Sequence, residues 1–150
     1  MNRLISFTPD TIDCLPLPAK VPKGIEHEFR EAETCLGSGC LRAGAGLFRS
    51  VLDKVFRANG YKKNRESLAS QIDAACEDGV ITQSRKNKAH EEIRVLGNDV
   101  LHDDWHEIPE ADVLAARRYS QRVLEDFYDD RSEVERILTE AGRITPDQKT

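Results

Sequence analysis

Three polar side chains in the second half of the chain have types and spacing that could support chemistry on a phosphodiester. Arg94, Asn98 and His102 follow one another at intervals of four residues. On a helix, each step of four residues turns the direction by only about 40°, so the three side chains form one stripe. Arginine carries a permanent planar cation suited to phosphate, and histidine exchanges a proton near neutral pH. His102 could therefore act as a general base or acid, Arg94 could stabilise charge, and Asn98 could orient either.

The same stripe also has a purely structural interpretation. Asn98 and His102 could cap the free carbonyl groups at the end of a helix, while Arg94 pairs with an acidic residue. From the spacing alone we prefer this capping interpretation, and catalysis is the alternative.

The basic residues are concentrated just before this stripe. Arg85, Lys86 and Lys88 lie near the start of the helix that the pattern predicts there, and the loop at 61–66 adds three more cations. These side chains could contact a phosphate backbone, or they could form an ordinary solvated face. Residues 103–150 are acidic in balance, whereas residues 1–102 are nearly neutral. We therefore expect any nucleic-acid contact to lie in the first two thirds of the chain.

Composition indicates one globular domain and excludes several classes of protein. The chain has 150 residues, of which 33% are charged and 39% hydrophobic, and its formal net charge is −5. This balance argues against a strongly basic nucleic-acid coat protein. No apolar run is long enough to span a membrane, and the first residues lack the apolar core of a signal peptide. We expect a cytoplasmic protein with no membrane contact.

Metal ligands are few and poorly spaced. The four cysteines form no C-x-x-C pair, which makes a structural zinc site improbable. The segment from His102 to His106 contains two histidines and two aspartates, but no other predicted helix offers a matching pair of ligands. We expect no metal and no cofactor.

Apolar residues recur with the period of a helix through most of the chain, and no segment alternates as a strand would. The pattern predicts an all-α antiparallel bundle of about five helices. An extended arm precedes the bundle domain at 25–130, and a short helix follows it, with a disordered tail from Arg143. The boundaries expected are 1–24 for the arm, 25–37, 40–58, 67–77, 82–101 and 109–128 for the helices, and 131–150 for the C-terminal part.

The order of several short segments resembles one family. These segments are Val21-Pro22, Phe-Arg-Glu-Ala at 29–32, the Ala- and Gly-rich run at 42–53, Asp-Gly-Val-Ile at 78–81 and the string at 93–102. Together they resemble the prokaryotic domain of unknown function 4145 over about residues 15–130. That family is similar to the HEPN superfamily of helical domains, many of which are metal-independent ribonucleases that act as dimers.

The resemblance implies a site and two possible functions. Asn98 and His102 match the polar residue and the histidine of the superfamily motif, while Gly97 stands where its tightest form has arginine and Arg94 lies one turn earlier. Gly97 favours a dimerisation or adaptor module of a prokaryotic defence or RNA-associated system, with RNA or a defence protein as partner. The alternative is a metal-independent endoribonuclease whose composite site of Arg94, Asn98 and His102 lies at a dimer interface.

The resemblance also implies a homodimer, and the small residues at 44–46 fit a close approach by another helix. That helix could belong to a second subunit or to the same chain. A monomeric mass in light scattering would contradict the dimer.

Overall fold

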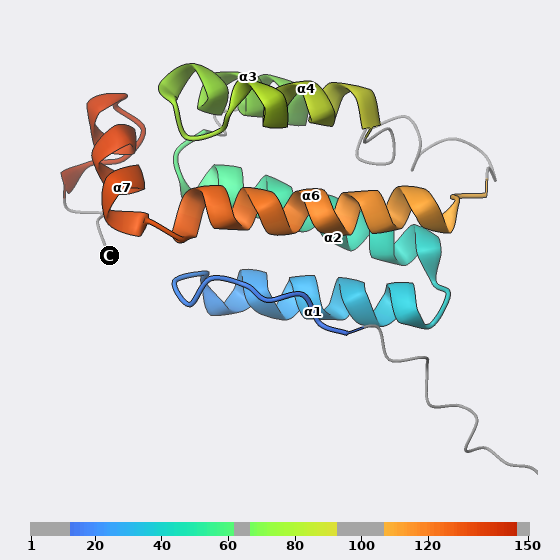
Figure 1. Cartoon of the computed structure of the whole chain (residues 1–150). Coiled ribbons are helices and arrows are strands. Elements are labelled where there is room, and N and C mark those ends of the chain that lie inside the picture. Colours follow the sequence, from blue (N-terminus) through green and yellow to red (C-terminus); the bar gives the residue numbers. More distant parts are fainter. Residues whose placement is uncertain (1–12, 62–66, 93–106, 147–150) are drawn as a thin grey trace, which may run out of the picture.

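The computed structural model describes residues 13–61, 67–92 and 107–146. Within these ranges the chain is all-helical, with six helices and no strand. Figure 1 shows α1, α2 and α6 side by side, with α3 and α4 paired beyond them and α7 across one end. The helices are α1 (Lys23–Gly37), α2 (Leu41–Ala58), α3 (Leu68–Asp78), α4 (Gln83–Glu92), α6 (Glu110–Tyr128) and α7 (Arg131–Glu140).

The periodic spacing of apolar residues predicted the positions of these helices closely. The observed ends of α1, α2, α3 and α6 lie within two residues of the expected ones. Local caps explain this agreement, because Ser67 accepts a hydrogen bond from the Ser70 amide and Gly79 ends α3 with φ of 92°. Pro109 precedes α6 as its N-cap residue rather than serving as its first helical residue. Of the long helix expected at 82–101, residues 93–101 lie outside the described part of the chain.

The expectation of an antiparallel arrangement is wrong for the central pair of helices. Gly44 near the start of α2 lies against Val113 near the start of α6, and Asn59 at the end of α2 donates to Tyr128 at the end of α6, with Nδ2 and the hydroxyl 3.1 Å apart. The two helices therefore run in the same direction, while α1 runs opposite to both (Figure 1). The physical reason is that α3 and α4 intervene in the sequence and return the chain to the end at which α2 began.

One continuous core joins the helices. Edge-to-face rings gather at the end where α2 and α6 finish, with the centroids of Phe56 and Phe127 5.4 Å apart and those of Phe56 and Tyr61 5.9 Å apart. Ahead of α1, Val21 is buried, and Leu15 and Leu17 pack against the core. Residues 13–22 thus pack against the helices, while residues 1–12 of the expected arm lie outside the described residues.

The expected disordered tail is folded as far as Pro146. Ile144 is buried, and Arg143 donates to Asp78 at 2.9 Å while its guanidinium lies 4.7 Å from the centroid of the Tyr61 ring. Tyr61 also donates its hydroxyl to Asp78, at 2.7 Å. These contacts tie the segment after α7 to the ends of α2 and α3, so it belongs to the domain.

This contact depends on a glycine. Gly60 has φ of 86°, and a Cβ there would lie 2.0 Å from the Arg143 carbonyl oxygen. We expect Gly60→Ala to lower the free energy of unfolding by about 3 kcal/mol in urea denaturation, because strain and a backbone clash add. The control is Gly79→Ala, where φ is also positive but nothing lies within 4 Å of the added Cβ; its cost should be about 1 kcal/mol. Equal losses would contradict the packing of the tail.

Candidate functional site

The described part of the chain stops just short of the stripe predicted from the sequence. Arg94, Asn98 and His102 lie outside the described residues, so their arrangement stays a prediction. The described residues do include α4, which carries the three cations that the sequence assigned to nucleic acid.

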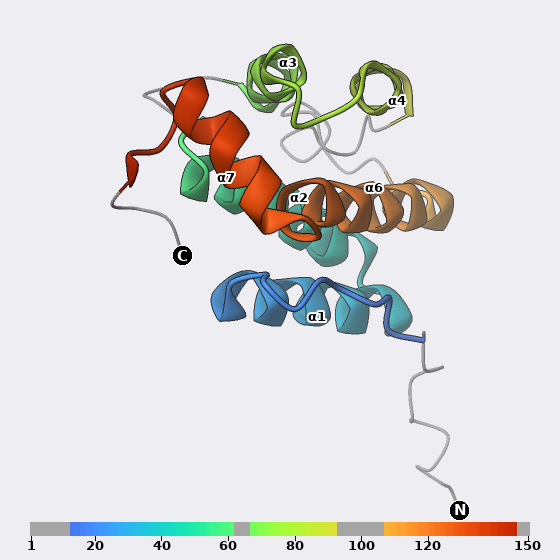
Figure 2. The same cartoon turned by 60° about the vertical axis from the view of Figure 1, so that its left-hand side comes forward.

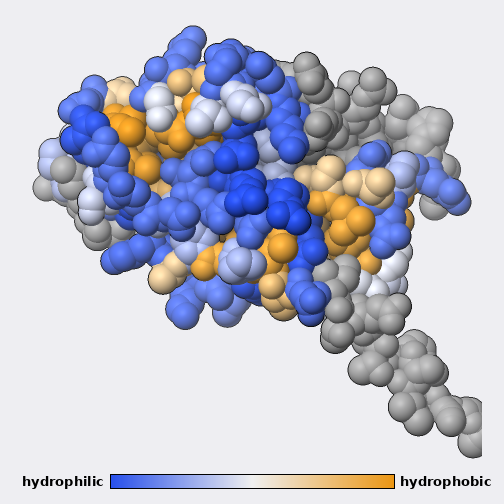
Figure 3. Space-filling model, in the orientation of Figure 1, coloured by the Kyte–Doolittle hydropathy of each residue, from blue (hydrophilic) through white to orange (hydrophobic). Residues whose placement is uncertain are grey.

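A basic groove lies between α4 and α6. Arg85 and Lys88 line it from α4, and Arg118, Tyr119 and Arg122 line it from α6, around a volume of about 330 Å³. The α4 residues are three apart and the α6 arginines four apart, so each pair lies on one face of its helix. Figure 3 shows hydrophilic surface over the middle of α6 and toward α4, between apolar areas. Two helices far apart in sequence thus bring four cations together.

Lys86 does not belong to this groove. Its ammonium lies 3.8 Å from the Asp73 carboxylate of α3. The three cations predicted as one basic cluster therefore separate into two sets. Arg85 and Lys88 face α6, and Lys86 faces α3.

Arg85 links the two walls of the groove. Its Nε donates to Asp126 Oδ2 at 2.8 Å, and its Nη2 lies 3.4 Å from Oδ1. Burial raises the pKa of the Asp126 carboxyl, although the hydrogen bond and the charge of Arg85 lower it. Removing Arg85 would leave a buried carboxylate unpaired, which is costly. An anion in the groove would therefore contact the guanidinium N–H groups that Asp126 does not use and leave the pair intact.

Tyr119 lines the groove and has a buried hydroxyl. The residue is 2% exposed, and its hydroxyl has no hydrogen-bond partner among the described residues. Burial raises the pKa of this phenol; the charge of Arg85 lowers it and the charge of Asp126 raises it, each by less than burial does. The group is therefore protonated at neutral pH. A buried unpaired hydroxyl costs free energy, which an acceptor that reached it would remove.

The two arginines of α6 were missed by the sequence reasoning. Arg118 and Arg122 are exposed, and they lie in the acidic last third of the chain, where we expected phosphate to be repelled. Net charge over a segment ignores which face of a helix each charge occupies, so that expectation did not anticipate two arginines on one groove. The sequence pattern that could have identified them is their spacing of one helical turn beside the core residues Tyr119 and Val123.

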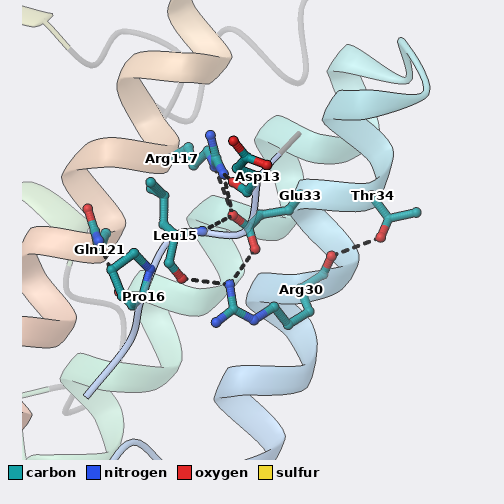
Figure 4. A network of polar contacts seen from close by, with 8 residues as sticks. All are labelled: Asp13, Leu15, Pro16, Arg30, Glu33, Thr34, Arg117 and Gln121. Carbon is teal, nitrogen blue, oxygen red and sulfur yellow. Dashed lines mark hydrogen bonds and ion pairs between the residues drawn. The ribbon is translucent and has the colours of Figure 1, made fainter. Parts of the chain in front are cut away.

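A second polar network holds the N-terminal arm against α1 and α6 (Figure 4). Glu33 of α1 is 4% exposed; its Oε2 accepts from Arg117 Nε at 2.9 Å and from the Leu15 amide at 3.0 Å. Arg30 donates to the other oxygen of Glu33 and to the Leu15 carbonyl, and Gln121 donates to the Pro16 carbonyl at 2.9 Å. The network satisfies backbone groups of the arm, so its role is structural.

A family model matches residues 30–143, from within α1 to just beyond α7. Its description is Domain of unknown function (DUF4145). The chain belongs to this family. The DUF4145 match covers both walls of the basic groove and the ion pair that joins them. Searches of the curated proteins and of the solved structures find no match for the chain.

The described part of the chain contains neither a group of metal ligands nor a membrane-spanning helix. No group of three or more histidine, cysteine, aspartate or glutamate side chains there could hold a metal ion. None of the described helices is both long and apolar enough to cross a membrane.

The arm network yields a stability test. Glu33→Gln removes the charge that faces Arg117, which is 8% exposed, and leaves that cation buried with weaker partners. We expect the free energy of unfolding to fall by about 3 kcal/mol, and hydrogen exchange over residues 15–21 to accelerate. Glu133→Gln on α7 is the control, because Glu133 is exposed and pairs only along its own helix with Arg136. Equal, small effects of both changes would contradict the role of Glu33.

Proposed function

We propose that the chain is a HEPN-like adaptor module of a prokaryotic defence or RNA-associated system, and that its basic groove binds RNA phosphate. The observation that carries the proposal is the convergence of Arg85, Lys88, Arg118 and Arg122 from two helices on one groove. Phosphate contacts provide most of the affinity of proteins for nucleic acid that is independent of sequence. A protein of net charge −5 gains such affinity only where cations are gathered locally.

The chemistry of the groove supports binding rather than catalysis. Its described lining consists of arginine, lysine and tyrosine, whose N–H and O–H groups donate hydrogen bonds to anions. Burial makes the Tyr119 phenol still harder to ionise. None of these lining groups can act as a general base at neutral pH, which fits an adaptor better than an enzyme.

Dimerisation in the cytoplasm belongs to the same proposal, and its support is the family resemblance. Gly44 no longer adds to that support, because it serves contacts within the chain. A Cβ at Gly44 would lie 3.5 Å from the Ala32 carbonyl oxygen and from the Leu36 amide nitrogen of α1. Gly44 thus faces α1 inside one subunit, where an added Cβ would make ordinary van der Waals contact.

RNA binding tests the adaptor proposal. Arg118→Gln removes one groove cation without breaking an ion pair among the described residues. We expect about tenfold weaker binding of a single-stranded RNA in fluorescence anisotropy, and a shallower dependence of log affinity on log salt, by about one unit. Arg136→Gln is the matched control, since this arginine of α7 is exposed and pairs with Glu140 at 2.8 Å. If both variants bind RNA as wild type does, the groove is not the RNA site.

The second candidate is a metal-independent endoribonuclease. The observation that favours it is the position of the groove along the chain, because α4 ends at Glu92, just before Arg94. Arg94 thus follows the end of the groove helix by two residues in the sequence. His102 would then act as general base on the ribose 2′-hydroxyl or as acid toward the leaving oxygen. Arg94 would stabilise the charge of the transition state, and Asn98 would orient His102 or the substrate.

Cleavage of RNA by the purified protein separates the two candidates. If the chain is a nuclease, cleavage should persist in EDTA, His102→Ala should abolish it, and Arg94→Lys should weaken it because lysine lacks the planar fork. Circular dichroism of the His102 variant is the control, since loss of helix would favour the capping role. A wild-type protein that dimerises and binds RNA but cleaves none would leave the adaptor as the function.

A further inference from the structure

The basic groove has room for a phosphate group. Its volume of about 330 Å³ corresponds to roughly ten water molecules in the liquid, at about 30 Å³ each. The groove is not enclosed, so the rest of an RNA strand can continue outside it.

The positive charge is also local. Beyond the groove, Lys86 faces Asp73, and Arg136 pairs along α7 with Glu133 and Glu140. Arg57 likewise pairs with Asp53, at 3.0 Å. Within the groove, Arg85 pairs with Asp126 and Arg122 pairs with Glu125, each at 2.8 Å, whereas Arg118 has no ion-pair partner among the described residues.

The excess positive charge at that point is larger than the charge of an internal phosphate. A phosphodiester carries one negative charge and two non-bridging oxygens. A phosphomonoester carries a charge of about −1.5 to −2 at pH 7 and three terminal oxygens, each a strong acceptor. Three guanidinium groups and one ammonium surround this groove, and two carboxylates, Asp126 and Glu125, pair with Arg85 and Arg122. Two positive charges are left in excess, which matches the charge of the monoester.

We propose that the groove is a binding site for the terminal phosphomonoester of an RNA strand. This inference rests on the proposed function and narrows it from RNA phosphate in general to an RNA end. Arg118, which has no ion-pair partner among the described residues, and Arg122 bind the phosphate from α6. Arg85 stays paired with Asp126 and contributes its remaining guanidinium N–H groups, and the buried Tyr119 hydroxyl gains an acceptor. The phosphate then joins α4 to α6.

The test uses one RNA sequence in three forms: with a 5′-phosphate, with a 3′-phosphate, and with hydroxyl groups at both ends. Fluorescence anisotropy with the full chain should give at least about tenfold tighter binding to one or both phosphorylated forms, because each charge-assisted hydrogen bond contributes about this factor. Which form binds tighter identifies the end. Arg118→Gln should remove the preference, Tyr119→Phe should reduce it several-fold, and Arg136→Gln should leave it unchanged.

The possible failures are distinguishable. Equal binding of all three RNAs, still weakened by Arg118→Gln, would overturn end recognition and leave the proposed function intact. No binding of any RNA would overturn both. Tighter binding of a phosphoserine peptide than of phosphorylated RNA would assign the groove to a protein partner and overturn the proposal. An unchanged preference in Tyr119→Phe would remove the hydroxyl from the site, with thermal melting confirming that each variant is folded.

Discussion

The ion pair between Arg85 and Asp126 is the contact on which the functional surface depends. Ala89 is the only apolar residue of α4, so this helix has little hydrophobic surface with which to stay in place. The fork of Arg85 on Asp126 attaches α4 to α6, and Lys86 pairs with Asp73 of α3. A phosphate in the groove would add contacts that join α4 to α6.

The rest of the fold holds α6, the other wall of the groove, firmly in place. α6 packs along α2 in the same direction, and the aromatic cluster of Phe56, Tyr61 and Phe127 fixes the ends of both helices. On its other side, α6 is joined to α1 and to the N-terminal arm through Arg117 and Glu33. Arg118 and Arg122 therefore project from a helix that is secured on two sides, which reduces the entropic cost of holding a phosphate.

The sequence predicted the helices because each carries a periodic apolar face and ends at a residue with a recognisable cap, such as Ser67 or Gly79. It could not predict the shared direction of α2 and α6, which depends on how α3 and α4 return the chain. Two groove residues, Arg85 and Lys88, were found from local charge density. Arg118 and Arg122 were not, because they become part of the site only when α6 lies beside α4, and contacts between distant segments leave no local signal.

Hydrogen–deuterium exchange of the full chain, with and without saturating RNA, tests most directly whether a phosphate joins α4 to α6. The account predicts that RNA slows amide exchange along α4, between Gln83 and Glu92, far more than along α1, because bound phosphate adds contacts to both walls of the groove. Unchanged exchange in α4 while RNA is bound, with protection confined to the arm and α1, would contradict it.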